Sequence, residues 1–210
     1  MLFALLLIIV VSLLIDAEFF GVSRRWLGHW KIAREITELE RDVALNPHNV
    51  SALNDLGRLR VLRGAPERAV EPLERAIERM HDSDEANFYL GLAYLRTGKE
   101  REGEERIKQA IELNPNFRYG EPFLRLGTHY LERGRLEEAL SMLSKFEAIH
   151  TSSTEGLYLL GEAYRRLGRP EQAGEHYRKS VEAFHHSPHY KKRDERRWYW
   201  ASRMALWREG

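Results

Sequence analysis

The chain has 210 residues, a formal net charge of +1 and 31% charged residues. This balanced charge provides no global field that would attract nucleic acid or a membrane surface. The chain has no cysteine, which excludes disulfides, thiolate metal sites and cysteine nucleophiles but does not fix the compartment.

Residues 1–22 form an apolar segment that is interrupted only near its end, by Asp16 and Glu18. A membrane-spanning helix needs about 20 residues. No Lys or Arg precedes the apolar run, and residues 15–17 are a poor context for signal-peptide cleavage. We therefore expect an uncleaved single-pass transmembrane helix in preference to a secretory signal.

Basic residues after this segment predict its orientation. Arg24, Arg25 and Lys31 follow the span, whereas only the terminal amine precedes it. Because Lys and Arg accumulate on the cytoplasmic side, we expect the rest of the chain in the cytoplasm, held at a bacterial inner membrane. Arg24, Arg25 and Trp26 are the expected membrane-interface residues, since Trp favours that boundary. The alternative for Trp26 is packing against the folded domain.

Residues 23–47 are expected to hold a juxtamembrane stretch and a packing helix. The apolar residues Ile32, Ile36, Leu39 and Val43 share one helical face, and Asn46-Pro47 ends the segment. We expect a helix over residues 30–45 that packs against the domain that follows.

Four Leu-Gly pairs dominate the centre of the chain, at spacings of 34, 36 and 34 residues. They are Leu56-Gly57, Leu90-Gly91, Leu126-Gly127 and Leu160-Gly161. A fixed period of this length predicts a stack of helical repeats. The glycine of each pair allows two helices to approach closely, and a second set, Gly64, Gly98, Gly134 and Gly168, ends the first helix of each unit.

The ladder predicts paired helices. First helices are expected near 50–63, 84–97, 121–133 and 154–167, and second helices near 66–80, 100–113, 136–149 and 170–184. Ser152 and Glu155 have capping-box spacing at the start of the last unit. Two extra residues between the second and third units, in a stretch that carries Phe117 and Tyr119, predict one irregular stacking angle.

The series of Leu-Gly, Tyr, Ala, large apolar and Pro positions resembles the tetratricopeptide repeat, a helix-turn-helix unit. The resemblance covers residues 48–185, with repeats near 50–83, 84–115, 120–151 and 154–185. Arg60 replaces the expected Tyr and Gly103 the expected Ala. The resemblance implies an all-α, right-handed solenoid of about four units that acts as a non-enzymatic scaffold.

The resemblance further implies that a concave groove, formed by the first helices, binds a protein or peptide. The expected partner-binding residues are Asn54, Arg58, Phe88, Leu92, Leu95, Leu124, Arg125, Thr128, Leu131, Tyr158, Glu162 and Arg165. The alternative is that the leucines are buried against neighbouring helices. If the groove interpretation holds, Leu92→Glu and Leu131→Glu should abolish partner binding while the fold persists.

Residues 186–210 form a basic, aromatic terminal segment with a helix expected over residues 194–207. Such a helix would cap the last repeat, since arrays need a covering element at each end. The same mixture of Arg, Lys and Trp can contact anionic lipid or nucleic acid, of which nucleic acid is the less favoured. A second hypothesis is therefore a structural assembly subunit that self-associates or contacts lipid through this helix.

The sequence contains no catalytic signature, since it lacks both a phosphate-binding glycine loop and a Gly-x-Ser-x-Gly elbow. His185, His186 and His189 are close in sequence, but Ser187-Pro188 breaks their helical spacing. We expect no enzyme activity, no metal and no cofactor.

Overall fold

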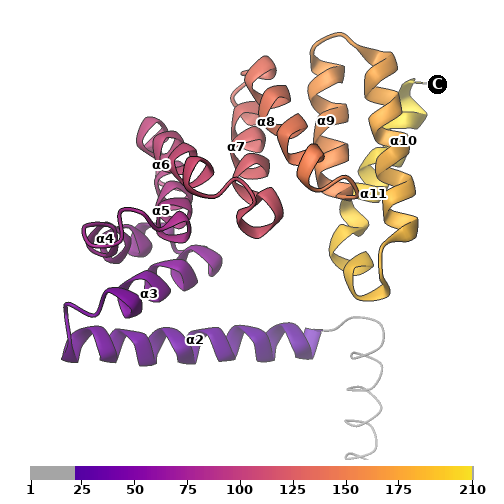
Figure 1. Cartoon of the computed structure of the whole chain (residues 1–210). Helices are drawn as coiled ribbons and strands as arrows, with labels where there is room; N and C mark the ends of the chain where they lie inside the picture. The colour runs from indigo at the N-terminus through magenta and orange to yellow at the C-terminus, as the bar shows by residue number, and fades with distance from the viewer. Residues whose placement is uncertain (1–21, 210) are drawn as a thin grey trace, which may run out of the picture.

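A computed structural model describes residues 22–209, and the side chains of residues 30–208, as a curved stack of helices that contains no β-strand in this range (Figure 1). The elements are α2 (Val22–Leu45), α3 (Val50–Leu62), α4 (Pro66–Ile77), α5 (Asp84–Arg96), α6 (Glu100–Leu113), the 3-10 turn η2 (Phe117–Gly120), α7 (Glu121–Glu132), α8 (Leu136–Ile149), α9 (Thr154–Arg166), α10 (Pro170–His186) and α11 (His189–Glu209).

The all-helical repeat fold is confirmed. Helices α3, α5, α7 and α9 are the first helices of four units, and α4, α6, α8 and α10 are the second helices. The two helices of each unit pack together, and each second helix also packs against the helix that follows it. The four predicted helix-ending glycines have positive φ values of 72° to 83°, the left-handed conformation that glycine adopts at low cost.

The Leu-Gly glycines lie where the two helices of a unit touch. A Cβ atom on Gly57 would lie 2.3 Å from Leu73 Cγ, and one on Gly161 would lie 2.5 Å from Tyr177 Cε1. Leu73 and Tyr177 are fully buried. A methyl group at either glycine would therefore force the two helices or the large side chain to move.

One predicted cap is wrong by one residue. Ser153, not Ser152, is the N-cap of α9, and its hydroxyl accepts a hydrogen bond from the Gly156 N–H at 3.1 Å. Glu155 pairs with Arg125 of α7 at 3.2 Å and does not close a capping box. A long-range ion pair therefore takes the place of the predicted local hydrogen bond.

The terminal helices are longer than predicted. Helix α2 begins at Val22, not at residue 30, and α11 begins at His189, not at residue 194. Arg60, which replaces the expected Tyr, pairs with Glu40 of α2 at 2.7 Å. This departure from the repeat pattern therefore helps to attach α2 to the first unit.

The junction between the second and third units is irregular, as the two extra residues predict. In η2, Arg118 and Tyr119 have φ values of 47° and 59°, which side-chain-bearing residues rarely adopt. Arg96 and Arg166 each donate a hydrogen bond to a carbonyl of the preceding unit, but Glu132 occupies the matching position of α7 and cannot donate one.

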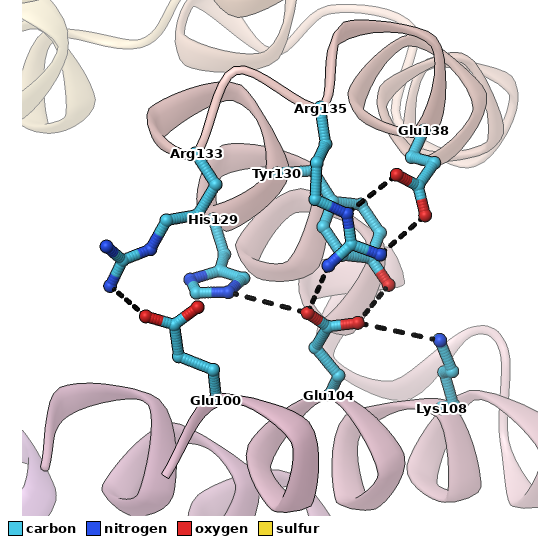
Figure 2. A network of polar contacts seen from close by, with 8 residues as sticks. All are labelled: Glu100, Glu104, Lys108, His129, Tyr130, Arg133, Arg135 and Glu138. Carbon is cyan, nitrogen blue, oxygen red and sulfur yellow. Dashed lines mark hydrogen bonds and ion pairs between the residues drawn. The ribbon is translucent and has the colours of Figure 1, made fainter. Parts of the chain in front are cut away.

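A polar network centred on Glu104 crosses this junction instead (Figure 2). The Tyr130 hydroxyl donates to Glu104 at 2.9 Å, and the Arg135 guanidinium donates to the same carboxylate. Lys108 and His129 lie 3.7 Å from it. Burial and the hydrogen bond to Glu104 raise the pKa of Tyr130, so its hydroxyl remains a donor at neutral pH. The network thus joins α6 to α7 and α8 through one buried carboxylate.

Within residues 22–209, none of the helices combines the length and apolarity needed to cross a membrane. The predicted span, residues 1–22, lies outside the described residues apart from Val22, which begins α2.

Candidate functional site

An open cleft of about 310 Å³ lies where η2, α7, the α8–α9 turn and α11 meet. Its lining combines charged and aromatic side chains from segments that are far apart in the sequence. The residues are Arg118, Tyr119, Glu121, Leu124, Arg125, Phe146, His150, Ser153, Glu155, Asp194, Glu195, Arg197 and Trp198. The irregular junction and the terminal helix therefore contribute to one site.

Two arginines of the cleft are fixed by ion pairs. Arg118 lies 2.6 Å from Glu121 and donates a hydrogen bond to the Tyr89 hydroxyl at 2.7 Å. Arg125 lies 3.1 Å from Glu121 and 3.2 Å from Glu155. These contacts link α5, α7 and α9 and hold the charged groups in place before any ligand arrives.

Aromatic rings form the edges of the cleft. Tyr119 is 78% exposed, although its backbone is held in the left-handed conformation. Trp198 of α11 is half-buried, with its ring 5.2 Å from that of Tyr158 and the Arg197 guanidinium 4.2 Å above it. A strained loop that presents an exposed ring is typical of a functional position.

His150 lies in the cleft wall, with ring centroids 6.2 Å from Tyr119 and 5.6 Å from Phe146. Burial lowers its pKa, and the positive charge of Lys191 acts in the same direction. The imidazole is therefore neutral at pH 7 and has one donor and one acceptor nitrogen.

Two of the twelve predicted groove residues, Leu124 and Arg125, line this cleft. Phe88, Leu92 and Leu131 are buried within the chain, at 0%, 8% and 4% exposure. These side chains are buried against neighbouring helices, as the alternative to the groove interpretation expects. The expectation that Leu92→Glu and Leu131→Glu would leave the fold intact is corrected accordingly, since each would place a charge in the core.

The remaining predicted residues all have contacts within the chain, and Leu95 is half-buried and packs against the core. Asn54 and Arg58 of α3 both face Glu85 of α5, at 3.4 Å and 3.7 Å. In the last unit, the Tyr177 hydroxyl and Arg165 donate to Glu162, while Tyr158 packs on Trp198. The Thr128 hydroxyl donates to the Leu124 carbonyl. The polar side chains of the predicted groove therefore already form hydrogen bonds and ion pairs within the chain. Whether the groove binds a partner stays a prediction.

Sequence reasoning missed Arg118, Tyr119 and Trp198 as site residues. The two-residue insertion was the available signal, since an insertion in a strict repeat marks a local change of function or geometry. Nothing local in the sequence indicates that Trp198 faces the insertion.

The histidine cluster, His185, His186 and His189, does not line this cleft. Arg24, Arg25 and Trp26 belong to α2, but their side chains lie outside the described range. Among the residues described, no group of three or more His, Asp or Glu side chains could hold a metal ion.

Family models described as tetratricopeptide repeat match residues 84–117 and 124–188. The identification of tetratricopeptide repeats is therefore confirmed for these two stretches.

Several solved structures share the fold. The crystal structure of MamA is similar to 78% of this chain over 94% of its own, with 24% identity and a TM-score of 0.67. TTC0263, a thermophilic repeat protein of Thermus thermophilus, has 25% identity over 88% of this chain and 95% of its own, with a TM-score of 0.64. YrrB, described as a repeat protein with an unusual peptide-binding site, has 18% identity over 84% of this chain and 89% of its own, with a TM-score of 0.61.

Among curated proteins, the BBSome complex member BBS4 of Bos taurus is 26% identical over 132 residues, which is 63% of this chain. The chain spans about a quarter of the length of that relative.

Proposed function

Because residues 84–117 and 124–188 are tetratricopeptide repeats, we propose that this chain is a non-enzymatic scaffold that holds a segment of a partner protein in the cleft between η2 and α11. The observation that carries the proposal is the convergence of the strained Tyr119 with Arg197 and Trp198 of the terminal helix. Rigid aromatic rings beside preplaced arginines are the usual anchors of peptide recognition.

The chemistry of the cleft limits the kind of segment. Arg118, Arg125 and Arg197 face four carboxylates of the same cleft, so neither sign of charge dominates. A short segment that places an apolar side chain between the rings of Tyr119 and Trp198, with one acidic and one basic neighbour, would complement the cleft. The unusual peptide-binding site described for YrrB is a precedent within the fold.

The test is selection of peptides from a random library on the full chain in detergent, followed by calorimetry. Selected peptides should lose at least about tenfold in affinity for the double variant Tyr119→Ala/Arg197→Ala. The matched control is Arg178→Ala, an exposed arginine on α10 outside the cleft, which should bind as the wild type does. Equal binding by the cleft variant would contradict the proposal.

The scaffold is further proposed to be anchored in a membrane by residues 1–22, with the repeats in the cytoplasm. The support is the apolar sequence of that segment and the basic residues that follow it. Removal of residues 1–21 should release the protein from the membrane fraction. A reporter that is active only outside the cytoplasm should stay inactive when fused to the C-terminus, and its activity would refute the orientation.

A second candidate function, a structural assembly subunit, is favoured by one feature of α11. Trp200 and Trp207 are 55% and 84% exposed on the face of this helix that is turned away from the array. Large apolar side chains grouped at a surface are typical of an interaction site.

A further inference from the structure

Helix α11 carries an exposed strip on the side that is turned away from α9 and α10 (Figure 1). On its inner side, the Tyr199 ring stacks on Phe184 of α10 at 4.4 Å, and the Ser202 hydroxyl donates to Ser180 at 2.8 Å. The exposed residues follow one another at spacings of three and four, which places them on one face of the helix. This outer strip consists of Arg193, Arg196, Trp200, Met204 and Trp207.

The outer strip is positively charged and contains no acidic residue. Every residue that lies three or four positions from Arg193 or Arg196 within α11 is basic or aromatic. Lys179 of α10, by contrast, pairs with Glu175 four residues earlier at 2.7 Å. The positive charge of the strip is therefore not offset by a carboxylate on the same face.

The acidic side chains that the structure describes on α11 are turned to other parts of the chain. Glu195 accepts hydrogen bonds from the hydroxyls of Thr154 and Ser187, and Asp194 lines the cleft. A surface that approaches the outer strip therefore meets arginines and not carboxylates.

Two tryptophans and a methionine form the apolar part of the strip. Trp200, Met204 and Trp207 are 55%, 55% and 84% exposed. Arg203 precedes Met204 and Arg208 follows Trp207, and the helical rotation of about 100° per residue places these arginines on opposite sides of the apolar part. Tryptophan with flanking arginines is typical of helices that lie in the headgroup region of a membrane.

Met204 argues against close packing of another helix on this face. In α9, Gly156 contacts the preceding unit, and Gly161, five residues later, faces α10, where a Cβ would lie 2.5 Å from Tyr177 Cε1. In α11, Tyr199 contacts the preceding helix, and Met204 follows it by the same interval. A large side chain at this place holds a second helix at a distance, whereas a fluid lipid surface requires no such fit.

We propose that the outer strip of α11 binds the surface of a membrane that contains anionic lipid. The arginines contact lipid phosphates, and the tryptophan rings lie at the level of the headgroups. Each basic residue near such a surface strengthens binding about fivefold, so Arg193 and Arg196 together contribute more than about tenfold. The proposal rests on the second candidate function, for which it names the partner, and it involves no residue that lines the cleft.

The test places a polarity-sensitive fluorophore on the strip of the full chain, which has no cysteine of its own. Met204→Cys is labelled and reconstituted in vesicles of phosphatidylcholine alone, or of phosphatidylcholine and phosphatidylglycerol in equal parts. We expect emission at shorter wavelength only in the anionic vesicles, and a smaller shift as salt is added, because salt screens the attraction. The control label, at Glu105→Cys on the exposed side of α6, should have the same emission in both kinds of vesicle.

A charge variant tests the contribution of the arginines. In labelled Met204→Cys, the further changes Arg193→Gln/Arg196→Gln should lower the ratio of bound to free strip, measured from the size of the shift, about tenfold or more. The matched control is Arg68→Gln/Arg101→Gln, which removes the same charge from exposed sites on α4 and α6 and should keep the shift.

Three outcomes would overturn the proposal. The first is equal emission of the Met204→Cys label in both kinds of vesicle, or an equal shift of the Glu105→Cys label. The second is a shift in detergent that grows with protein concentration, which assigns the strip to a second copy of the chain. The third is a larger shift with an RNA oligonucleotide than with the anionic vesicles, which assigns it to nucleic acid. Peptide binding in the cleft is measured separately, so none of these outcomes decides the scaffold function.

Discussion

Gly91 of α5 and Gly103 of α6 lie backbone against backbone. A Cβ atom on Gly91 would be 2.9 Å from the Gly103 carbonyl oxygen, and a Cβ on Gly103 would be 2.9 Å from the Gly91 carbonyl oxygen. The departure of Gly103 from the usual Ala therefore has a physical cause. In this unit both contacting residues lack a side chain, so the two helices approach more closely than an Ala at either position would permit.

Gly91→Ala should destabilise the array, although alanine normally stabilises a helix by about 1 kcal/mol relative to glycine. The new methyl group meets backbone atoms that cannot rotate away, so we expect the free energy of unfolding to fall by about 1–2 kcal/mol in chemical denaturation. Gly127→Ala is the comparison, because its nearest neighbour is the Leu143 side chain at 2.8 Å, which can adjust. A Gly91→Ala protein as stable as the wild type would show that the contact is not limiting.

Glu104→Gln should weaken the junction between α6 and α7. The buried carboxylate accepts from Tyr130 and from the charged Arg135, and hydrogen bonds to charged groups contribute about 1.5–3 kcal/mol (Figure 2). Because Arg135 is partly exposed and keeps its ion pair with Glu138, we expect the free energy of unfolding to fall by an amount near the lower limit of that range. Glu100→Gln removes only the exposed pair with Arg133 and should change stability by less than about 0.5 kcal/mol. Equal effects of the two variants would argue against the buried network.

Tyr119→Gly should separate stability from binding. Glycine removes the strain of the left-handed backbone, which stabilises the fold by about 1–2 kcal/mol. It also gives the unfolded chain more conformational freedom, which lowers stability by about 0.5–1 kcal/mol. The melting temperature should stay equal or rise, while affinity for cleft-selected peptides falls. Tyr119→Ala loses the same ring but keeps the strained backbone, so it should bind as poorly and melt lower. If both variants bind peptide like the wild type, Tyr119 is not part of the site.

His150→Gln should reduce the loss of stability on acidification. Burial and Lys191 hold the pKa of His150 below its ordinary value of 6.5. The unfolded chain therefore binds a proton more readily, so the contribution of His150 is present above pH 6.5 and declines as the pH falls through the folded-state pKa. Melting temperatures at about pH 7.5 and pH 5.5 should differ less in the variant than in the wild type. His81→Gln, at an exposed site, should keep the full difference, and an unchanged difference in His150→Gln would refute the assignment.

Much of the fold could be predicted from the sequence because it depends on neighbours along the chain. Contacts within about one repeat length determine the Leu-Gly spacing, the helix-ending glycines and the starts of the eight repeat helices. The irregular junction was also predictable, since two extra residues must change the spacing between units. In each case the deciding interaction, a close helix approach or a left-handed cap, lies within about one repeat length.

The candidate site could be predicted only in part. Tyr119 and Trp198 line one cleft although they are far apart in the sequence. Ser153 caps α9, and Glu155 pairs with Arg125 of α7 instead of closing a local capping box. The burial of Leu92 and Leu131, which sequence reasoning assigned to a binding surface, likewise follows from how α5 and α7 settle against their neighbours. The repeat pattern determined the units, but the angle at which they stack decided which side chains remain exposed, because small rotations between units add up along the array.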